Sequence, residues 1–184
     1  MYKSANGILL VRKHAQKSLF LDQNNLEMSK PIVTPLQARV KLEHFCAYQE
    51  RCHVEVAEKL RSLGVEQPVA DDIIVHLINS GFLNEERFAK SFARGKHRIK
   101  FWGKVRITAE LKARGISSYN ISAALSELDP EEYVQQFETI AHRSWEAMRE
   151  PDIARKKKKI YDYLLRKGFE NQMIYDKLKL LSKS

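Results

Sequence analysis

The 184-residue sequence lacks the features that mark membrane proteins and β-sheet proteins. It has no run of about 18 apolar residues, so no segment is expected to span a membrane. No stretch alternates Val, Ile or Thr with polar residues in the way that half-buried strands do. Glycine and proline are scarce, at seven and five residues, and fall mostly between segments of helical periodicity. These absences, with abundant Leu, Ala, Glu, Lys and Arg, predict an all-α protein.

Cysteine usage and the N-terminal residues both favour the cytoplasm. Cys46 and Cys52 are six residues apart on what we predict to be one helix, which separates them by about 9 Å along its axis. A disulfide would require that helix to unwind, so we expect two free thiols. The apolar stretch 7–11 is too short for the core of a signal peptide, and basic residues follow it closely. Without an export signal, the expected location is cytoplasmic.

Candidate catalytic groups are also lacking. The sequence has no glycine-rich phosphate-binding loop, no metalloprotease histidine pair and no serine nucleophile elbow. The most suggestive cluster of metal-ligating residue types comprises His44, Cys46, Cys52 and His53. Cys52 is expected to point away from Cys46, and no further cysteine exists to complete a structural zinc site. We interpret the cluster as packed thiols and surface imidazoles, and predict a protein that is not an enzyme and uses no metal or cofactor.

A threefold internal repeat organises most of the chain. The segments 60–77, 111–128 and 164–181 align without a gap, and each begins with Leu and reaches Gly four residues later. Gly64, Gly115 and Gly168 fit the position just past a helix end, where a left-handed backbone is common. Apolar residues at spacings of three and four then predict a second helix after each glycine. Each repeat is therefore interpreted as helix, glycine stop, short turn and helix.

A further helix is predicted before each repeat. In the first, 36–51, we expect Val40, Phe45 and Tyr48 to supply the apolar contacts. Asn84 and Asp129 are expected to cap the helices that begin the other two units. The result is nine helices in three modules, 36–81, 82–128 and 129–184, stacked in an elongated, curved array. Residues 1–35 do not fit the repeat and form either a flexible extension or a segment before an alternative start at Met28.

The net charge of +9 is concentrated in two stretches. Residues 94–114 hold eight basic side chains against one acid (+7), and residues 155–168 hold seven against one (+6). Such a concentration favours an anionic partner. The candidate partner- or DNA-binding residues are Arg94, Lys96, Arg98, Lys100, Lys104, Arg106, Lys112 and Arg114, with Lys156, Lys157, Lys158 and Lys159.

Two aromatic residues lie within the first basic stretch and have two possible roles. Phe101 and Trp102 could stack on exposed bases, or they could close the hydrophobic seam between helices. We favour the second role. Acidic residues at 127, 129, 131 and 132 interrupt a continuous basic face, which argues against a protein that binds nucleic acid alone.

Several short motifs resemble the RecX family of recombinase regulators. The segment 48–53, followed by Lys59-Leu60 and Gly64, is similar to the family's opening module. The segment 81–89, Gly-Phe-Leu-Asn-Glu-Glu-Arg-Phe-Ala, is similar to the family's most recognisable motif. The likeness continues at Gly103-Lys104, Arg106-Ile107, Glu110-Leu111 and Gly115-Ile116, and the resemblance covers roughly 36–184.

The resemblance implies a non-enzymatic bacterial regulator that binds the RecA recombinase in the helical groove of the RecA–DNA filament. Such proteins inhibit strand exchange and ATP hydrolysis by RecA, in recombination and DNA repair. The family has no catalytic motif to transfer, so the candidate residues above rest on charge and position. Two alternatives stay open: a stand-alone basic nucleic-acid-binding protein, and a purely structural interaction solenoid. A monomer is the expected oligomeric state.

Overall fold

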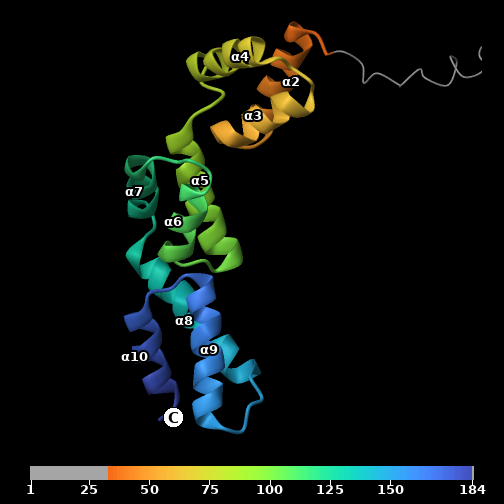
Figure 1. Ribbon diagram of the computed structural model, residues 1–184. Coiled ribbons are helices and arrows are strands. Elements are labelled where there is room, and N and C mark those ends of the chain that lie inside the picture. The colour runs from red at the N-terminus through yellow and green to blue at the C-terminus, as the bar shows by residue number, and fades with distance from the viewer. Residues whose placement is uncertain (1–32, 184) are drawn as a thin grey trace, which may run out of the picture. The chain divides into compact units, whose positions relative to one another are not determined.

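The computed structural model describes residues 33–183, which hold nine α-helices and no β-strand (Figure 1). The prediction of an all-α fold is therefore confirmed. The predicted extension lies almost wholly outside the described residues, and the module boundaries stay a prediction. In chain order the helices are α2 (Pro35–Tyr48), α3 (His53–Ser62), α4 (Gln67–Asn79), α5 (Glu85–Lys100), α6 (Lys104–Lys112), α7 (Ser118–Ser126), α8 (Pro130–Ala147), α9 (Ile153–Lys167) and α10 (Asn171–Leu181).

Helix α2 buries a different face from the predicted one. Its buried residues are Ala38, Leu42 and Cys46, spaced four apart on one side. Val40 and Tyr48 are exposed, by 41% and 88%, so the prediction that they supply apolar contacts was wrong. The reason is that both lie off the Ala38–Cys46 stripe, which packs against α3 and α4. The helix also ends at Tyr48, three residues earlier than predicted.

The two cysteines are free thiols, as predicted, but they do not share a helix. Cys46 lies in α2, whereas Cys52 is the residue that precedes α3. Both side chains are buried, and burial raises the pKa of both thiols. They therefore behave as small packed hydrophobic groups.

The predicted helix caps are confirmed. The Asn84 side-chain oxygen accepts a hydrogen bond of 2.8 Å from the Arg87 backbone N–H at the start of α5. Asp129 accepts one of 2.8 Å from the Glu132 N–H at the start of α8, where Pro130 occupies the first turn. Each cap satisfies a backbone donor that the helix itself leaves free, and typically contributes about 1 kcal/mol.

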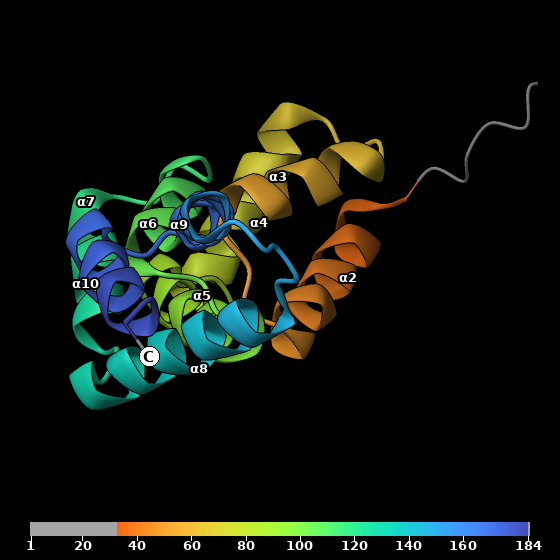
Figure 2. The ribbon, with the colours of Figure 1, turned by 90° about the horizontal axis from the view of Figure 1, so that it is seen from below.

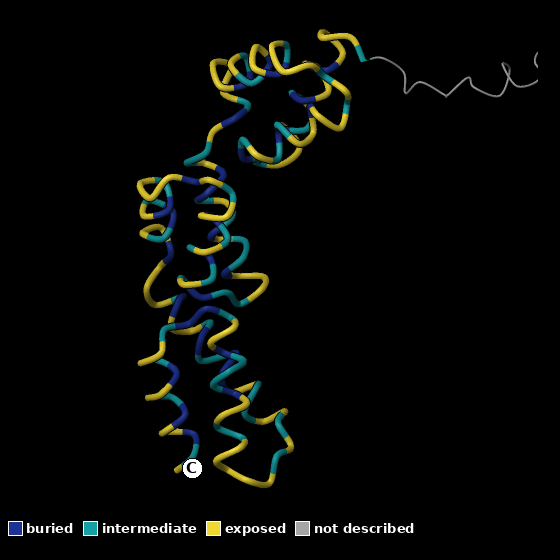
Figure 3. The backbone as a smooth tube through the Cα atoms, in the orientation of Figure 1, coloured by how far each residue is buried: buried dark blue, intermediate teal, exposed yellow. Residues whose placement is uncertain are grey.

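One continuous core joins α5 through α10. Helix α5 packs most extensively against α7, and α8 packs against both α9 and α10. Figure 2 views α9 nearly end-on and α8 from the side, so these two helices cross at a large angle. Figure 3 shows buried positions recurring along α10, as one apolar stripe requires. The largest fully buried side chains of this core include Phe137, Phe169, Leu111, Leu164 and Ile174.

The three repeat glycines all have left-handed backbones, as the sequence predicted. Their φ angles are +73° at Gly64, +74° at Gly115 and +89° at Gly168. Only Gly168 is crowded: a Cβ there would lie 2.3 Å from the Cβ of Arg106. A Cβ on Gly103 would lie 2.1 Å from the Gly168 carbonyl oxygen, so the two backbones cross in direct contact. This Gly103–Gly168 crossing places the turn between α5 and α6 against the end of α9.

Candidate functional site

Helix α5 carries basic side chains on two opposite edges. The first edge consists of Lys90, Arg94 and Arg98, spaced four residues apart. The second edge consists of Lys96 and Lys100, which are rotated by about 200° from Arg94 and Arg98 respectively, together with Lys104 and Arg106 of the following helix α6. The predicted binding residues on α5 therefore divide into two groups with different surroundings.

The first edge is neutralised by acidic residues. Lys90 contacts Glu127 at 2.8 Å, and Arg94 pairs with the same carboxylate. Arg98 donates two hydrogen bonds, of 2.7 and 2.8 Å, to Glu132. The hydrogen bond from Lys90 lowers the pKa of Glu127, and those from Arg98 lower the pKa of Glu132. These cations have partners within the chain, and little of their charge is left for another molecule.

The second edge differs from the first in its partners. Within residues 33–183, Lys96, Lys100, Lys104 and Arg106 form no ion pair. Lys96 and Arg106 instead lie against Trp102, with the Lys96 nitrogen 5.3 Å and the Arg106 guanidinium carbon 4.0 Å from its ring centroid. Lys104 lies 4.7 Å from the ring centroid of a tyrosine of α8. The charges on this edge are therefore available to an anion.

Phe101 and Trp102 pack against the core. Both rings are partly buried, which confirms that they close the seam between helices. Phe92 joins them, with its ring centroid 6.3 Å from that of Trp102. Lys96 also lies 5.1 Å from the Phe92 centroid. These rings hold cations in place rather than presenting open faces.

Helix α9 brings a further lysine to the second edge. The Lys167 ammonium donates a 2.9 Å hydrogen bond to the Lys100 carbonyl, and the Arg106 guanidinium donates one of 3.1 Å to the Arg166 carbonyl. Burial lowers the pKa of Lys167, and so do the neighbouring charges of Arg106 and Lys100. We call Lys100, Arg106 and Lys167 the cation cluster.

Lys167 was missing from the predicted binding residues. The sequence signal was its position beside Gly168, the glycine of the third repeat. The repeat pattern alone does not show that the backbone of another segment packs against the glycine turn of the third repeat and not against those of the first two. The contact depends on hydrogen bonds from the Gly103 N–H to the Lys167 carbonyl, at 2.8 Å, and from the Val105 N–H to the Gly168 carbonyl, at 3.1 Å.

The remaining predicted residues lie apart from the cation cluster or are already paired. Arg114 contacts Glu110 at 2.8 Å, and Lys112 lies at the end of α6. The run of four lysines at 156–159 lies in the first half of α9, on the order of 12 Å or more from Lys167 along the helix. Within it, the Lys159 ammonium contacts Glu150 at 2.5 Å. The structure therefore does not join the two predicted basic stretches as a whole.

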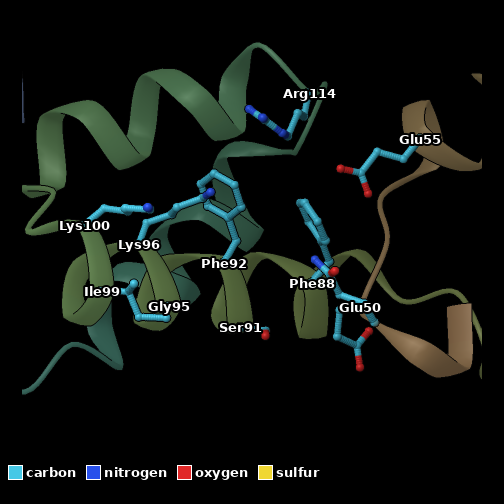
Figure 4. A pocket seen from close by; sticks show the side chains of 11 residues that line it. Glu50, Glu55, Phe88, Ser91, Phe92, Gly95, Lys96, Ile99, Lys100 and Arg114 are labelled. Atoms are coloured by element: carbon cyan, nitrogen blue, oxygen red, sulfur yellow. The ribbon is translucent and has the colours of Figure 1, made fainter.

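A groove of about 330 Å³ borders the second edge (Figure 4). Lys96 and Lys100 line one part of it, whereas Glu50 and Glu55, from the segment around the start of α3, line another. The floor includes Phe88 and Phe92 of α5. Glu50 contacts Arg87 at 2.5 Å and Glu55 lies 3.8 Å from Arg51, so the acids of this groove are already paired, whereas Lys96 and Lys100 form no ion pair within residues 33–183. An anionic partner would therefore meet this surface at Lys96 and Lys100 rather than along the whole groove.

The residues His44, Cys46, Cys52 and His53 are not grouped as the ligands of a metal ion would be. Among the described residues, no three His, Cys, Asp or Glu side chains lie close enough together to bind one ion. His53 Nδ1 is hydrogen-bonded to Glu85 at 2.9 Å. No helix within residues 33–183 is long and apolar enough to cross a bilayer.

Comparison with known proteins agrees with this arrangement of helices. Residues 84–125 match the family described as "RecX, second three-helix domain", and residues 131–178 match "RecX, third three-helix domain". The chain belongs to the RecX family. The crystal structure of RecX from Lactobacillus salivarius is similar, with a TM-score of 0.69 and 25% identity, over 82% of this chain and 97% of that one.

Two curated relatives extend the similarity. Regulatory protein RecX of Bacillus cytotoxicus is 25% identical over 171 residues, and that of Bacillus thuringiensis is 21% identical over 174. Each alignment covers 93% of this chain and 63% of the relative. The chain thus spans less than two thirds of the length of these relatives, whose names denote regulators.

Proposed function

We propose that this protein binds the RecA–DNA filament and inhibits or modulates RecA activity. The observation that carries the proposal is the cation cluster, in which Lys100, Arg106 and Lys167 lie together without an acidic partner among the described residues. A group of three cations without an acidic neighbour attracts an anion. Membership of the RecX family supports the RecA–DNA filament as the source of this anion. The protein acts in the cytoplasm as a non-enzymatic monomer without a cofactor, built from the modules 36–81, 82–128 and 129–184.

The test is single-stranded-DNA-dependent ATP hydrolysis by RecA while the protein is added. A regulator that binds filaments inhibits hydrolysis at well below one molecule per RecA, because capping or disassembly of one filament silences many subunits. Competition for DNA alone needs far more protein. An unchanged ATPase rate, with protein shown to be helical by circular dichroism, contradicts the proposal.

Stand-alone nucleic-acid binding is the second candidate function. The unpaired second edge of α5 favours it, because Lys and Arg are the usual phosphate contacts. The aromatic rings beside that edge are packed against the core and against cations, however, which removes the base stacking on which single-strand binders rely. This candidate predicts DNA binding without RecA and a steep loss of affinity between 50 and 200 mM salt, roughly a thousandfold for six phosphate contacts.

A further inference from the structure

An apolar pocket opens next to the cation cluster. It has a volume of about 460 Å³ and lies between α8, α9 and the turn that follows α5. Its apolar lining consists of Phe101, Ile140, Ala147, Met148, Ile160 and Tyr163. Arg143 and Lys167 also line it, so one member of the cation cluster belongs to the pocket wall. We call this the α8–α9 pocket.

Phe101 reaches the pocket through an unusual backbone. Its φ angle is +53°, and it is the only residue other than glycine with a positive φ in the described part of the chain. Its N–H donates a 3.0 Å hydrogen bond to the His97 carbonyl and ends α5. A left-handed backbone is costly for a bulky side chain. The left-handed backbone at Phe101 places its aromatic ring in the wall of the pocket.

The pocket is suited to an apolar side chain rather than to a nucleic-acid base. The Arg143 guanidinium carbon lies 5.9 Å from the Phe101 ring centroid, and the Lys167 ammonium nitrogen lies 5.6 Å from that of Tyr163. These cations compete with a base for the ring faces. The Ser144 hydroxyl already donates a 2.6 Å hydrogen bond to the Ile140 carbonyl. Arg143 and Lys167 only donate hydrogen bonds, so the N–H groups of a base would find few acceptors on the side chains of the pocket, whereas an apolar side chain needs none.

The charge around the pocket selects acidic neighbours for that side chain. Among the described residues, no Asp or Glu lines the pocket, and both charged lining residues are basic. Lys167 continues this positive rim to Lys100 and Arg106. Carboxylates that flank an apolar side chain would meet these three cations while the side chain fills the pocket.

We propose that the α8–α9 pocket docks an apolar side chain from an acidic segment of a partner protein. The inference rests on the proposed function in one respect, that the partner is a protein rather than free nucleic acid. It adds where the partner is held and what chemistry the held segment has: one large apolar residue with carboxylates on both sides. The cation cluster supplies the electrostatic attraction, and the pocket supplies selectivity for the apolar residue.

The direct test uses a fluorescein-labelled peptide, Asp-Glu-Phe-Glu-Asp, and its Phe-to-Ala counterpart, with the full chain and fluorescence anisotropy as the readout. The Phe peptide is expected to bind at least tenfold more tightly than the Ala peptide. Equal binding of the two peptides would reduce the site to a charged surface and overturn the proposal. Displacement of the Phe peptide from the pocket by oligothymidylate, with loss of oligothymidylate binding in a pocket-filling variant, would also overturn it.

Ala147→Trp is that pocket-filling variant, because Ala147 is an exposed residue that lines the pocket. It is expected to weaken the Phe peptide at least tenfold and leave the Ala peptide unchanged. Ala47→Trp, at an exposed position of α2 outside the pocket, is the matched control and is expected to bind both peptides normally. An unchanged affinity of Ala147→Trp for the Phe peptide would rule out the pocket as its site.

RecA filaments, added to the same variants in a pull-down, separate this inference from the proposed function. Wild-type protein that binds the peptide but not the filaments would contradict the RecA proposal and support the pocket with a different partner. Equal filament binding by wild type and by Ala147→Trp would contradict the proposal that the pocket holds the partner, and would leave the RecA proposal standing. Loss of filament binding in Ala147→Trp, with Ala47→Trp unaffected, supports both.

Discussion

The two basic edges of α5 have similar composition and different surroundings. Lys90, Arg94 and Arg98 face carboxylates at the end of α7 and the start of α8. Lys96 lies against the rings of Phe92 and Trp102, and the Lys100 carbonyl accepts a hydrogen bond from the Lys167 ammonium. The first edge therefore stabilises the contact between helices, whereas the charges of the second are not neutralised by any acid within residues 33–183. A count of basic residues in the sequence does not separate these roles, since the separation depends on where the acids lie in space.

The largest expected effect comes from the contact that assembles the second edge. Gly103→Ala places a Cβ 2.1 Å from the Gly168 carbonyl oxygen, and neither backbone can move without breaking the hydrogen bonds beside it. We expect a loss of about 2 kcal/mol or more in the free energy of unfolding, measured with urea. Gly95→Ala is the control, because its Cβ meets nothing within 4 Å and its site is helical. That variant is expected to gain about 0.5–1 kcal/mol.

Equal stability of Gly103→Ala and wild type would contradict a direct contact between the two backbones at the Gly103–Gly168 crossing. The crossing also holds Lys167 beside Lys100 and Arg106, so the same variant is expected to lose filament binding in proportion to its loss of structure. The first edge provides an internal reference, because its ion pairs join α5 to α7 and α8 and do not involve Gly168.

The second expected effect compares the two edges at equal change in charge. Lys100→Gln with Arg106→Gln removes two positive charges from the cation cluster, and is expected to weaken RecA-filament binding about tenfold. Arg94→Gln with Arg98→Gln removes two from the first edge, where both cations already have acidic partners. We expect that pair to change filament affinity by less than about twofold. Equal losses in co-sedimentation would mean that net charge, rather than the cluster, determines binding.

Much of the fold could be predicted from the sequence because its signals are local. Left-handed glycines after helices, and Asn84 and Asp129 as caps, depend on residues within one turn of each other. The α2 face was mispredicted because Val40 and Tyr48 lie off the Ala38–Cys46 stripe, and the choice of buried face depends on the contacts of α2 with α3 and α4.

The candidate site could be predicted only in part. The two edges of α5 follow from helical spacing once the helix is known, because residues four apart share a side and Lys96 lies opposite Arg94. The neutralisation of one edge does not follow, because Glu127 and Glu132 come from other helices. The addition of Lys167 depends on a backbone crossing between residues 65 positions apart, Gly103 and Gly168. A single sequence carries no pattern for such a contact.

The smallest expected effect tests the first edge through pH. Hydrogen bonds from Arg98 hold the pKa of Glu132 below its ordinary value of 4.5. A carboxyl group whose pKa is lower in the folded state stabilises the fold above the unfolded-state value, and this contribution is lost as the pH falls through the folded-state value. Arg98→Gln is therefore expected to lower the urea midpoint slightly at pH 7, and this difference from wild type narrows as the pH falls below 4.5.

Lys96→Gln is the control on the other edge. Since Lys96 has no acidic partner within residues 33–183, its difference from wild type should stay constant over the same range. A difference that narrows equally for both variants would mean that the two edges do not differ in how their charges are neutralised.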